Sequence, residues 1–191
     1  MSSGSQPATV LVVDDEREVA DVYALRLQER YETRTAYGGE AALSAVDESV
    51  DAVLLDRRMP GLSGDEVLER IRERGLECRV VMLTAVDPGL DIVEMDFDDY
   101  LCKPVEKADL VAAIEQQLRL KRYDDRLSEY LEVASKLALL EGELPVQQLE
   151  NDDRIRALAE RAETLEAELD ASIAEFEDIE SAFEEIARHP G

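Results

Sequence analysis

Three carboxylates follow two apolar segments in a pattern that could bind a metal ion. The run 9–13 is continuous and largely apolar, as in a buried parallel strand, and Asp14 and Asp15 follow it directly. A second run, 52–55, ends in Asp56. The carboxyl ends of parallel strands meet at one edge of a sheet, where ligands bind. The three carboxylates are therefore predicted to converge in one crevice.

Like charges at such close range require a cation. Ligation by oxygen alone, from few protein groups, suits Mg2+, which keeps several waters and accepts phosphate oxygens as further ligands. The pattern therefore predicts Mg2+-assisted phosphoryl chemistry on a carboxylate.

The elements that position these residues alternate along the first part of the chain. From Thr9 to about Leu118, short apolar runs alternate with amphipathic segments, which indicates βα units and a parallel sheet. We expect an α/β fold with a doubly wound, five-stranded parallel sheet, its strands at residues 9–13, 32–36, 52–55, 79–83 and 99–101. The helices are expected at 16–29, with Val19, Val22 and Leu25 inward, at 39–47, 63–74 and 90–95, and from Lys107 onward.

The last of these helices is expected to enter a second, helical module. Residues 107–141 contain neither Gly nor Pro, so the helix can continue unbroken until residues 142–145 turn the chain. After Asp152 and Asp153, apolar or small residues recur at helical spacing. They are Ile155, Leu158, Ala162, Leu165, Leu169, Ser172, Phe176, Ile179, Phe183 and Ile186.

Such a stripe needs a partner. It can pair with the preceding helix as a hairpin, with a second subunit as a coiled coil, or with another protein, and the short turn favours the hairpin. We expect a disordered tail at 1–8, the α/β domain at 9–118 and the helical module at 119–191.

The composition limits the partners. A formal net charge of -25 argues against nucleic acid, which requires clustered Lys and Arg. Dispersed acidity with only four lysines resembles the proteins of salt-loving microbes, although an ordinary acidic cytosolic protein remains an alternative.

The location is expected to be cytoplasmic. The first residues lack the basic and apolar regions of a secretory signal, and no apolar run is long enough to span a membrane. Cys78 and Cys102 show no paired spacing. The single histidine is His189, which argues against histidine metal sites and a phosphohistidine donor.

Five separated motifs resemble the receiver domain of two-component response regulators, over about residues 9–118. They occur in the family's order, and their joint occurrence is far more specific than any one alone. They are Asp14–Asp15, Asp56 with the following residues 57–61, Thr84, Tyr100 and Lys103–Pro104.

The resemblance implies a phosphoacceptor that assists its own phosphorylation and dephosphorylation rather than an enzyme. Asp56 would accept a phosphoryl group from a histidine kinase. Asp14, Asp15 and Asp56, together with the backbone carbonyl of Arg58, would bind Mg2+.

The residues of the remaining motifs would contact the phosphoryl group or change conformation when it is attached. Lys103 would supply a positive charge to its oxygens, and Pro104, expected in cis, would orient the loop. Thr84 would hydrogen-bond to the group, and Tyr100 would rotate into the space that Thr84 leaves.

The segment from Tyr123 to about Arg188 resembles the HalX domain appended to receivers in haloarchaea, through residues 123–127 and 130–131. The resemblance implies output through protein contacts, as a homodimer or with a downstream protein. A solvated hairpin that only stabilises the receiver is the alternative. The segment shows no helix-turn-helix and no basic stripe.

Other interpretations remain open. Asp14 and Asp15 could cap a helix, and Asp56 could belong to a turn. A Mg2+-dependent phosphatase of the haloacid dehalogenase kind needs a second Asp where Arg58 stands. A coiled-coil adaptor with an inactive receiver would be expected to lack one of the acidic residues or Lys103, and all are present.

Overall fold

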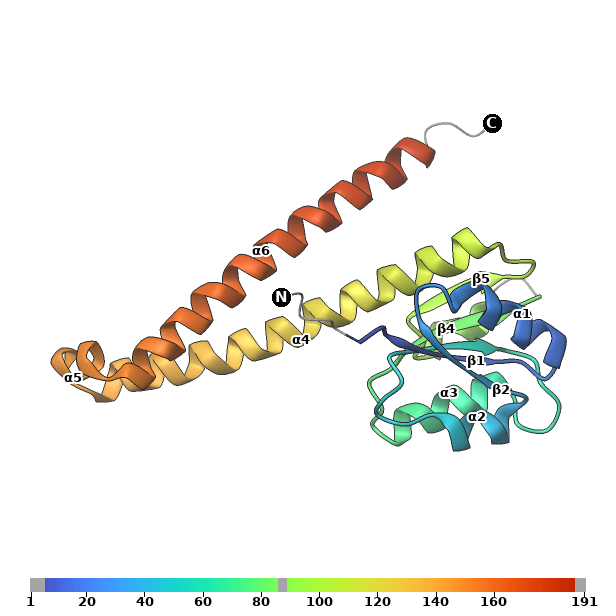
Figure 1. Cartoon of the computed structure of the whole chain (residues 1–191), viewed down its shortest axis with the longest axis horizontal. Coiled ribbons are helices and arrows are strands. Elements are labelled where there is room, and N and C mark those ends of the chain that lie inside the picture. Colours follow the sequence, from blue (N-terminus) through green and yellow to red (C-terminus); the bar gives the residue numbers. More distant parts are fainter. Residues whose placement is uncertain (1–5, 86–88, 188–191) are drawn as a thin grey trace. The chain divides into compact units, whose positions relative to one another are not determined.

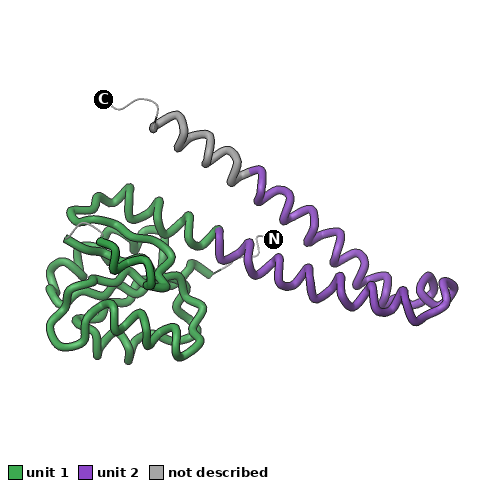
Figure 2. Tube along the Cα trace, turned by 180° about the vertical axis from the view of Figure 1, so that it is seen from behind, with its two compact units in different colours: residues 1–119 green, residues 120–191 purple. Residues whose placement is uncertain are grey.

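The chain consists of two compact units. The computed structural model describes residues 6–85 and 89–187, with side chains up to residue 174. The units comprise residues 1–119 and 120–191 (Figure 2). The predicted tail, 1–8, and His189 fall largely or wholly outside the described residues, although the carbonyl of Ala8 accepts a hydrogen bond from the Glu32 amide. Among the described helices, none has the length and apolar character that crossing a membrane would need.

The first unit contains the predicted five-stranded parallel sheet, in the order β2-β1-β3-β4-β5 (Figure 1). The central strands are buried on both faces, which explains their unbroken apolar sequences, whereas the edge strands are less apolar. The strands are β1 (Thr9–Val13), β2 (Glu32–Ala36), β3 (Ala52–Asp56), β4 (Arg79–Thr84) and β5 (Asp99–Cys102).

Helices cover both faces of this sheet, as expected for a doubly wound fold (Figure 1). The core on one face includes α2 (Gly39–Ala45) and α3 (Gly64–Glu73). The core on the other includes α1 (Arg17–Leu27) and the first turns of α4 (Lys107–Glu143). The segment predicted as a helix at 90–95 is a 3-10 helix, η1 (Leu90–Glu94).

The prediction of the inward face of α1 was wrong. Val22 is 45% exposed and Leu25 is 62% exposed, and only Val19 packs partly against the core. Residues spaced only by three positions move gradually around a helix. Residues that all face the sheet must instead be spaced by a mixture of three and four positions. The buried residues have that spacing, and they are Ala20, Tyr23, Ala24 and Leu27.

The second unit is a helical hairpin. The end of α4 leads through the short helix α5 (Val146–Asn151), which the sequence did not suggest, into α6 (Asp153–Ala187). Arg161 donates two hydrogen bonds of 2.8 Å to Glu129, and Arg126 pairs with Glu168 at 3.1 Å. These pairs run in opposite directions along the two helices, so α4 and α6 are antiparallel.

The predicted stripe of α6 is buried or half-buried within the chain where its side chains are described. Leu165 is fully buried and Leu169 is 7% exposed, and Val133 is buried on α4. This agrees with the hairpin that the sequence favoured. The last four stripe residues, Phe176, Ile179, Phe183 and Ile186, have side chains outside the described part.

Candidate functional site

The ends of β1 and β3 bring the three carboxylates together. Val13 pairs with Leu55 in the sheet register, so Asp14, directly after β1, and Asp56, the last residue of β3, lie at equivalent positions on neighbouring strands. One carboxylate oxygen from each of Asp14, Asp15 and Asp56 lies within 4.8 Å of the others. Asp14 and Asp56 are buried, whereas Asp15 is exposed. The cluster is therefore open to solvent on one side.

Lys103 joins this cluster from the end of β5. Its Nζ donates hydrogen bonds to Asp14 Oδ2 at 2.7 Å and to Asp56 Oδ1 at 2.8 Å. The Lys103 amide donates to the carbonyl of Thr84 at 2.6 Å, and the Lys103–Pro104 peptide bond is cis. The backbone of Thr84, at the end of β4, thus holds Lys103, whose ammonium group enters the cluster.

The electrostatics of the cluster favour an additional cation. Burial raises the pKa of Asp56; Lys103 opposes this shift, and Asp14 and Asp15 add to it. Burial lowers the pKa of Lys103, but its bonds to Asp14 and Asp56 outweigh burial, so this pKa is raised. Three carboxylates against one ammonium leave a formal charge of -2, and oxygen donors suit Mg2+.

Helix capping does not account for the acidic pair. The N-cap position of α1 is Glu16, and its side chain makes no capping bond. Asp14 Oδ1 accepts a hydrogen bond from the Glu16 amide at 2.9 Å, while Oδ2 binds Lys103. Asp14 therefore fixes the loop after β1 and also contributes to the cluster.

The loop after β3 is fixed tightly against α3. Ser63 and Glu66 form a capping box at the start of this helix. A Cβ atom at Gly64 would lie 2.2 Å from the carbonyl oxygen of Asp56, so only glycine lets the helix approach this strand end. Arg58 is exposed in the loop, and the role of its carbonyl stays a prediction.

Comparison with known proteins identifies the first unit. The profile of the response regulator receiver domain matches residues 10–115. The chain belongs to the response regulator receiver family. A second profile, that of the HalX domain, matches residues 119–186, as the sequence resemblance suggested.

A curated relative covers most of the chain. A protein of Haloferax volcanii named "Putative transcriptional regulator" is 47% identical over 165 residues, which is 86% of this chain and 28% of the relative. The chain thus spans less than a third of that protein's length.

Solved structures show the same receiver fold. A response regulator receiver domain protein from Clostridium thermocellum is 30% identical with a TM-score of 0.56, covering 60% of this chain and 97% of the other. A CheY-like receiver domain protein from Methanospirillum hungatei, 24% identical, gives a TM-score of 0.58 over 62% of this chain and 99% of its own. The second match concerns the fold alone.

The expected switch residues of the receiver lie near the cluster. Thr84 ends β4 and is 1% exposed. Tyr100 lies in β5, where its ring contacts Phe97 at 5.5 Å between centroids and its hydroxyl lies 3.4 Å from Arg57 Nη1. Pro104 is exposed. Their roles in switching stay predictions.

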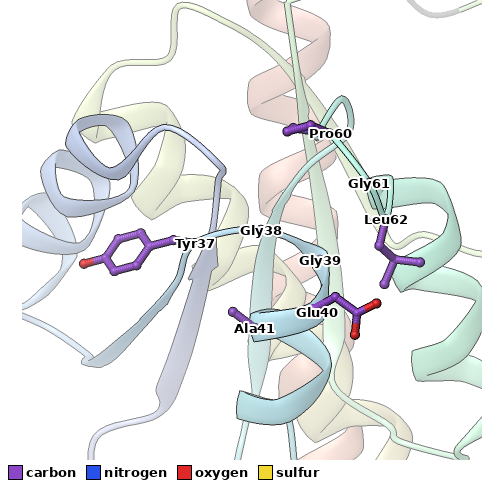
Figure 3. A pocket seen from close by; sticks show the side chains of 8 residues that line it. All are labelled: Tyr37, Gly38, Gly39, Glu40, Ala41, Pro60, Gly61 and Leu62. Atoms are coloured by element: carbon purple, nitrogen blue, oxygen red, sulfur yellow. The ribbon is translucent and has the colours of Figure 1, made fainter.

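Two cavities flank the loop that follows Asp56. One, of about 410 Å3, is lined by Arg57, Arg58, Met59, Ser63 and Asp65. The other, of about 390 Å3, lies between residues 37–41 and residues 60–62, which face each other in Figure 3. A Cβ at Gly39 would lie 2.5 Å from the Leu62 carbonyl oxygen, so these two loops meet closely beside that cavity.

Arg57 is a residue of the receiver that the sequence did not single out. Its side chain is only 12% exposed and binds Asp65 and Asp91. An arginine directly after Asp56 was visible in the sequence, but its partners lie on two other elements. No spacing rule connects them.

Proposed function

We propose that this response regulator accepts a phosphoryl group on Asp56 from a histidine kinase, in the presence of Mg2+. The observation that supports this most directly is the position of the Lys103 ammonium, which bridges Asp14 and Asp56 beside Asp15. A nucleophile, a positive charge and acidic metal ligands thus share one edge of the sheet.

Asp56 would be the nucleophile. A carboxylate oxygen attacks phosphorus and forms the new O–P bond while the N–P bond to the donor histidine breaks, and the bonding pair leaves with the imidazole nitrogen. Lys103 Nζ lies 2.8 Å from Asp56 Oδ1, within reach of a phosphoryl group on that carboxylate. Its charge would offset the approach of one anion to another.

The donors in the cluster fit Mg2+. Asp14, Asp15 and Asp56, with the carbonyl of Arg58, would hold the ion, and the formal charge of -2 leaves the site short of positive charge. When bound, Mg2+ would neutralise charge on the phosphoryl oxygens.

Thr84 and Tyr100 would respond to the phosphoryl group. Thr84 is buried at the end of β4, where its hydroxyl would hydrogen-bond to a phosphoryl oxygen. Tyr100 would then move, giving up its contact with Arg57, and Pro104 would keep the loop in place. A few kcal/mol of differential contact suffices to shift such an equilibrium.

The helical unit would carry the output through protein contacts. Residues 120–191 contain 8 basic against 20 acidic residues, a formal charge of -12, which opposes binding to nucleic acid. The protein bound by the helical unit would be a second copy of the chain or a downstream protein. The name of the Haloferax relative supports an output that reaches transcription, and the acidic charge of the helical unit would make that route indirect.

Acetyl phosphate tests the phosphoacceptor assignment. With Mg2+ present, intact mass should show one added phosphoryl group on the wild type and none on Asp56→Ala. Asp170→Ala, an exposed position of α6, is the matched control and should label like the wild type. Equal labelling of Asp56→Ala would show that Asp56 is not the phosphoacceptor. Labelling that a chelator does not diminish would show that the reaction does not need Mg2+.

A further inference from the structure

The Arg57 side chain ties three elements of the receiver together. Its Nε donates to Asp65 of α3 at 3.0 Å, and its Nη1 lies 3.4 Å from the Tyr100 hydroxyl of β5. Its Nη2 contacts both Asp65 and Asp91, the latter on η1. All three guanidinium nitrogens are thus engaged, with partners other than Asp56.

These side-chain bonds are not needed to fix the backbone beside Asp56. The Arg57 amide donates to the carbonyl of Leu83 at 2.8 Å, and its carbonyl accepts from the Gly64 amide at 2.9 Å. Main-chain bonds on both sides therefore hold the residue in place. The effect of the guanidinium must lie in the elements that it binds.

Of these elements, η1 depends most on the ion pair. None of its residues is buried, and Leu90 and Val93 are 91% and 77% exposed. Packing therefore contributes little to holding η1, whereas α3 places side chains in the core and Tyr100 and Leu101 of β5 pack partly against it. The bond between Arg57 and Asp91 fastens this weakly packed element to the residue next to Asp56.

We propose that the Arg57–Asp91 ion pair is a latch that holds η1 in the unphosphorylated receiver and opens when Asp56 is phosphorylated. This inference rests on the proposed phosphoacceptor function. Arg57 is a positioning residue in this scheme, because it acts on η1 and Tyr100 and does not contact the reacting carboxylate.

Electrostatics explains why the latch opens at Asp91. Two carboxylates already share one guanidinium, and one residue away phosphorylation replaces the Asp56 carboxylate, of charge -1, with an acyl phosphate of about -1.5 to -2. The carboxylate that is more easily solvated is the one expected to leave. Asp91 is 57% exposed against 43% for Asp65, and it sits on the element without buried residues.

Thermodynamic reciprocity makes the latch measurable. Occupation of the phosphoryl site and opening of the latch are coupled. The factor by which a bound phosphoryl mimic favours the open latch equals the factor by which opening the latch, here by mutation, strengthens binding of the mimic. Asp91→Asn breaks the ion pair at an exposed position. Glu94→Gln removes the same charge from the same element, at an exposed residue for which the structure gives no ion pair, and is the matched control.

The experiment uses the full chain with Mg2+ and beryllium fluoride as the mimic. Binding is measured by calorimetry, and hydrogen exchange is followed in the peptide that covers residues 89–95. In the wild type, exchange there should rise when the mimic binds. In Asp91→Asn, exchange should already be high without the mimic, and the affinity for the mimic should rise about fivefold. Glu94→Gln should match the wild type in both measurements.

The outcomes separate the two proposals. A wild type that does not bind the mimic would overturn the proposed function itself. A wild type that binds it, with Asp91→Asn unchanged in exchange and affinity, would overturn the latch alone. Equal changes in Asp91→Asn and Glu94→Gln would also overturn the latch, because they would reflect the charge of η1 and not the ion pair.

Discussion

The ammonium nitrogen of Lys103 lies 2.8 Å from Oδ1 of Asp56, and the same nitrogen binds Asp14. Lys103→Met would leave both buried carboxylates without this partner. Breaking a buried ion pair from one side typically costs about 3–5 kcal/mol. We expect a loss of this order in urea unfolding without divalent ions, and partial recovery when Mg2+ is added.

Lys107→Met is the control for this change. Lys107 pairs with Glu29 at 2.5 Å, but its side chain is 45% exposed and that of Glu29 is 71% exposed. Surface pairs of this kind contribute little. A similar loss of stability in both variants would mean that the buried position of Lys103 has no special importance.

Mg2+ should raise the melting temperature of the wild type. An ion that binds only the folded state stabilises it, by about 2.7 kcal/mol at a concentration a hundredfold above its dissociation constant. Asp15→Asn removes an exposed carboxylate, the proposed ligand, without disturbing the core and should reduce the rise. Differential scanning calorimetry at matched ionic strength checks this; an identical rise in the variant would exclude Asp15 as a ligand.

The contribution of Asp56 to stability without metal should fall with rising pH in the acidic range. The pKa of Asp56 is raised by burial, so charging this carboxyl disfavours folding. The penalty is absent below the unfolded-state pKa and complete above the raised, folded-state pKa. Asp56→Asn removes it, so the metal-free variant should be more stable than the wild type at neutral pH but not at low pH. Urea unfolding across the pH range measures the difference, and parallel curves would contradict it.

Gly64→Ala should disturb the loop that follows Asp56, the proposed phosphoacceptor. The added Cβ would lie 2.2 Å from the Asp56 carbonyl oxygen and 2.8 Å from the Arg57 Cα atom, so α3 or the strand end must shift. We expect a loss of about 1–3 kcal/mol and slower labelling by acetyl phosphate. Gly142→Ala meets nothing within 4 Å inside α4 and should stabilise by up to ~1 kcal/mol. Normal labelling of Gly64→Ala would show that the loop tolerates the shift.

Leu165→Ala should weaken the helical hairpin. Leu165 is fully buried in the second unit, and truncating such a leucine costs about 2–5 kcal/mol. Ile173→Ala, at a position 43% exposed, should cost much less. Circular dichroism during thermal unfolding checks the order. If the two variants lost equal helicity, α6 would be packed on a different face in solution.

The convergence of Asp14 and Asp56 could be predicted from the sequence because strand ends obey a short-range rule. A buried strand can be recognised in the sequence as an apolar run, and the residue after it must lie at the edge of the sheet where the strands end. The position of Lys103 needed the family resemblance, because its strand, Asp99–Cys102, is only half-buried and weakly apolar. The continuity of α4 followed from the absence of Gly and Pro in residues 107–141.

The sequence alone thus determined the layered α/β fold, the acidic edge and the long helix, because these depend on local patterns: apolar runs, the residues at strand ends and the absence of helix breakers. Only the tertiary structure decided which face of α1 is buried, because that depends on where the helix rests on the sheet. It also decided that Arg57 binds Asp65 and Asp91, 8 and 34 residues away. Such contacts arise from the packing of α3 and η1 beside the end of β3, which no repeat in the sequence encodes.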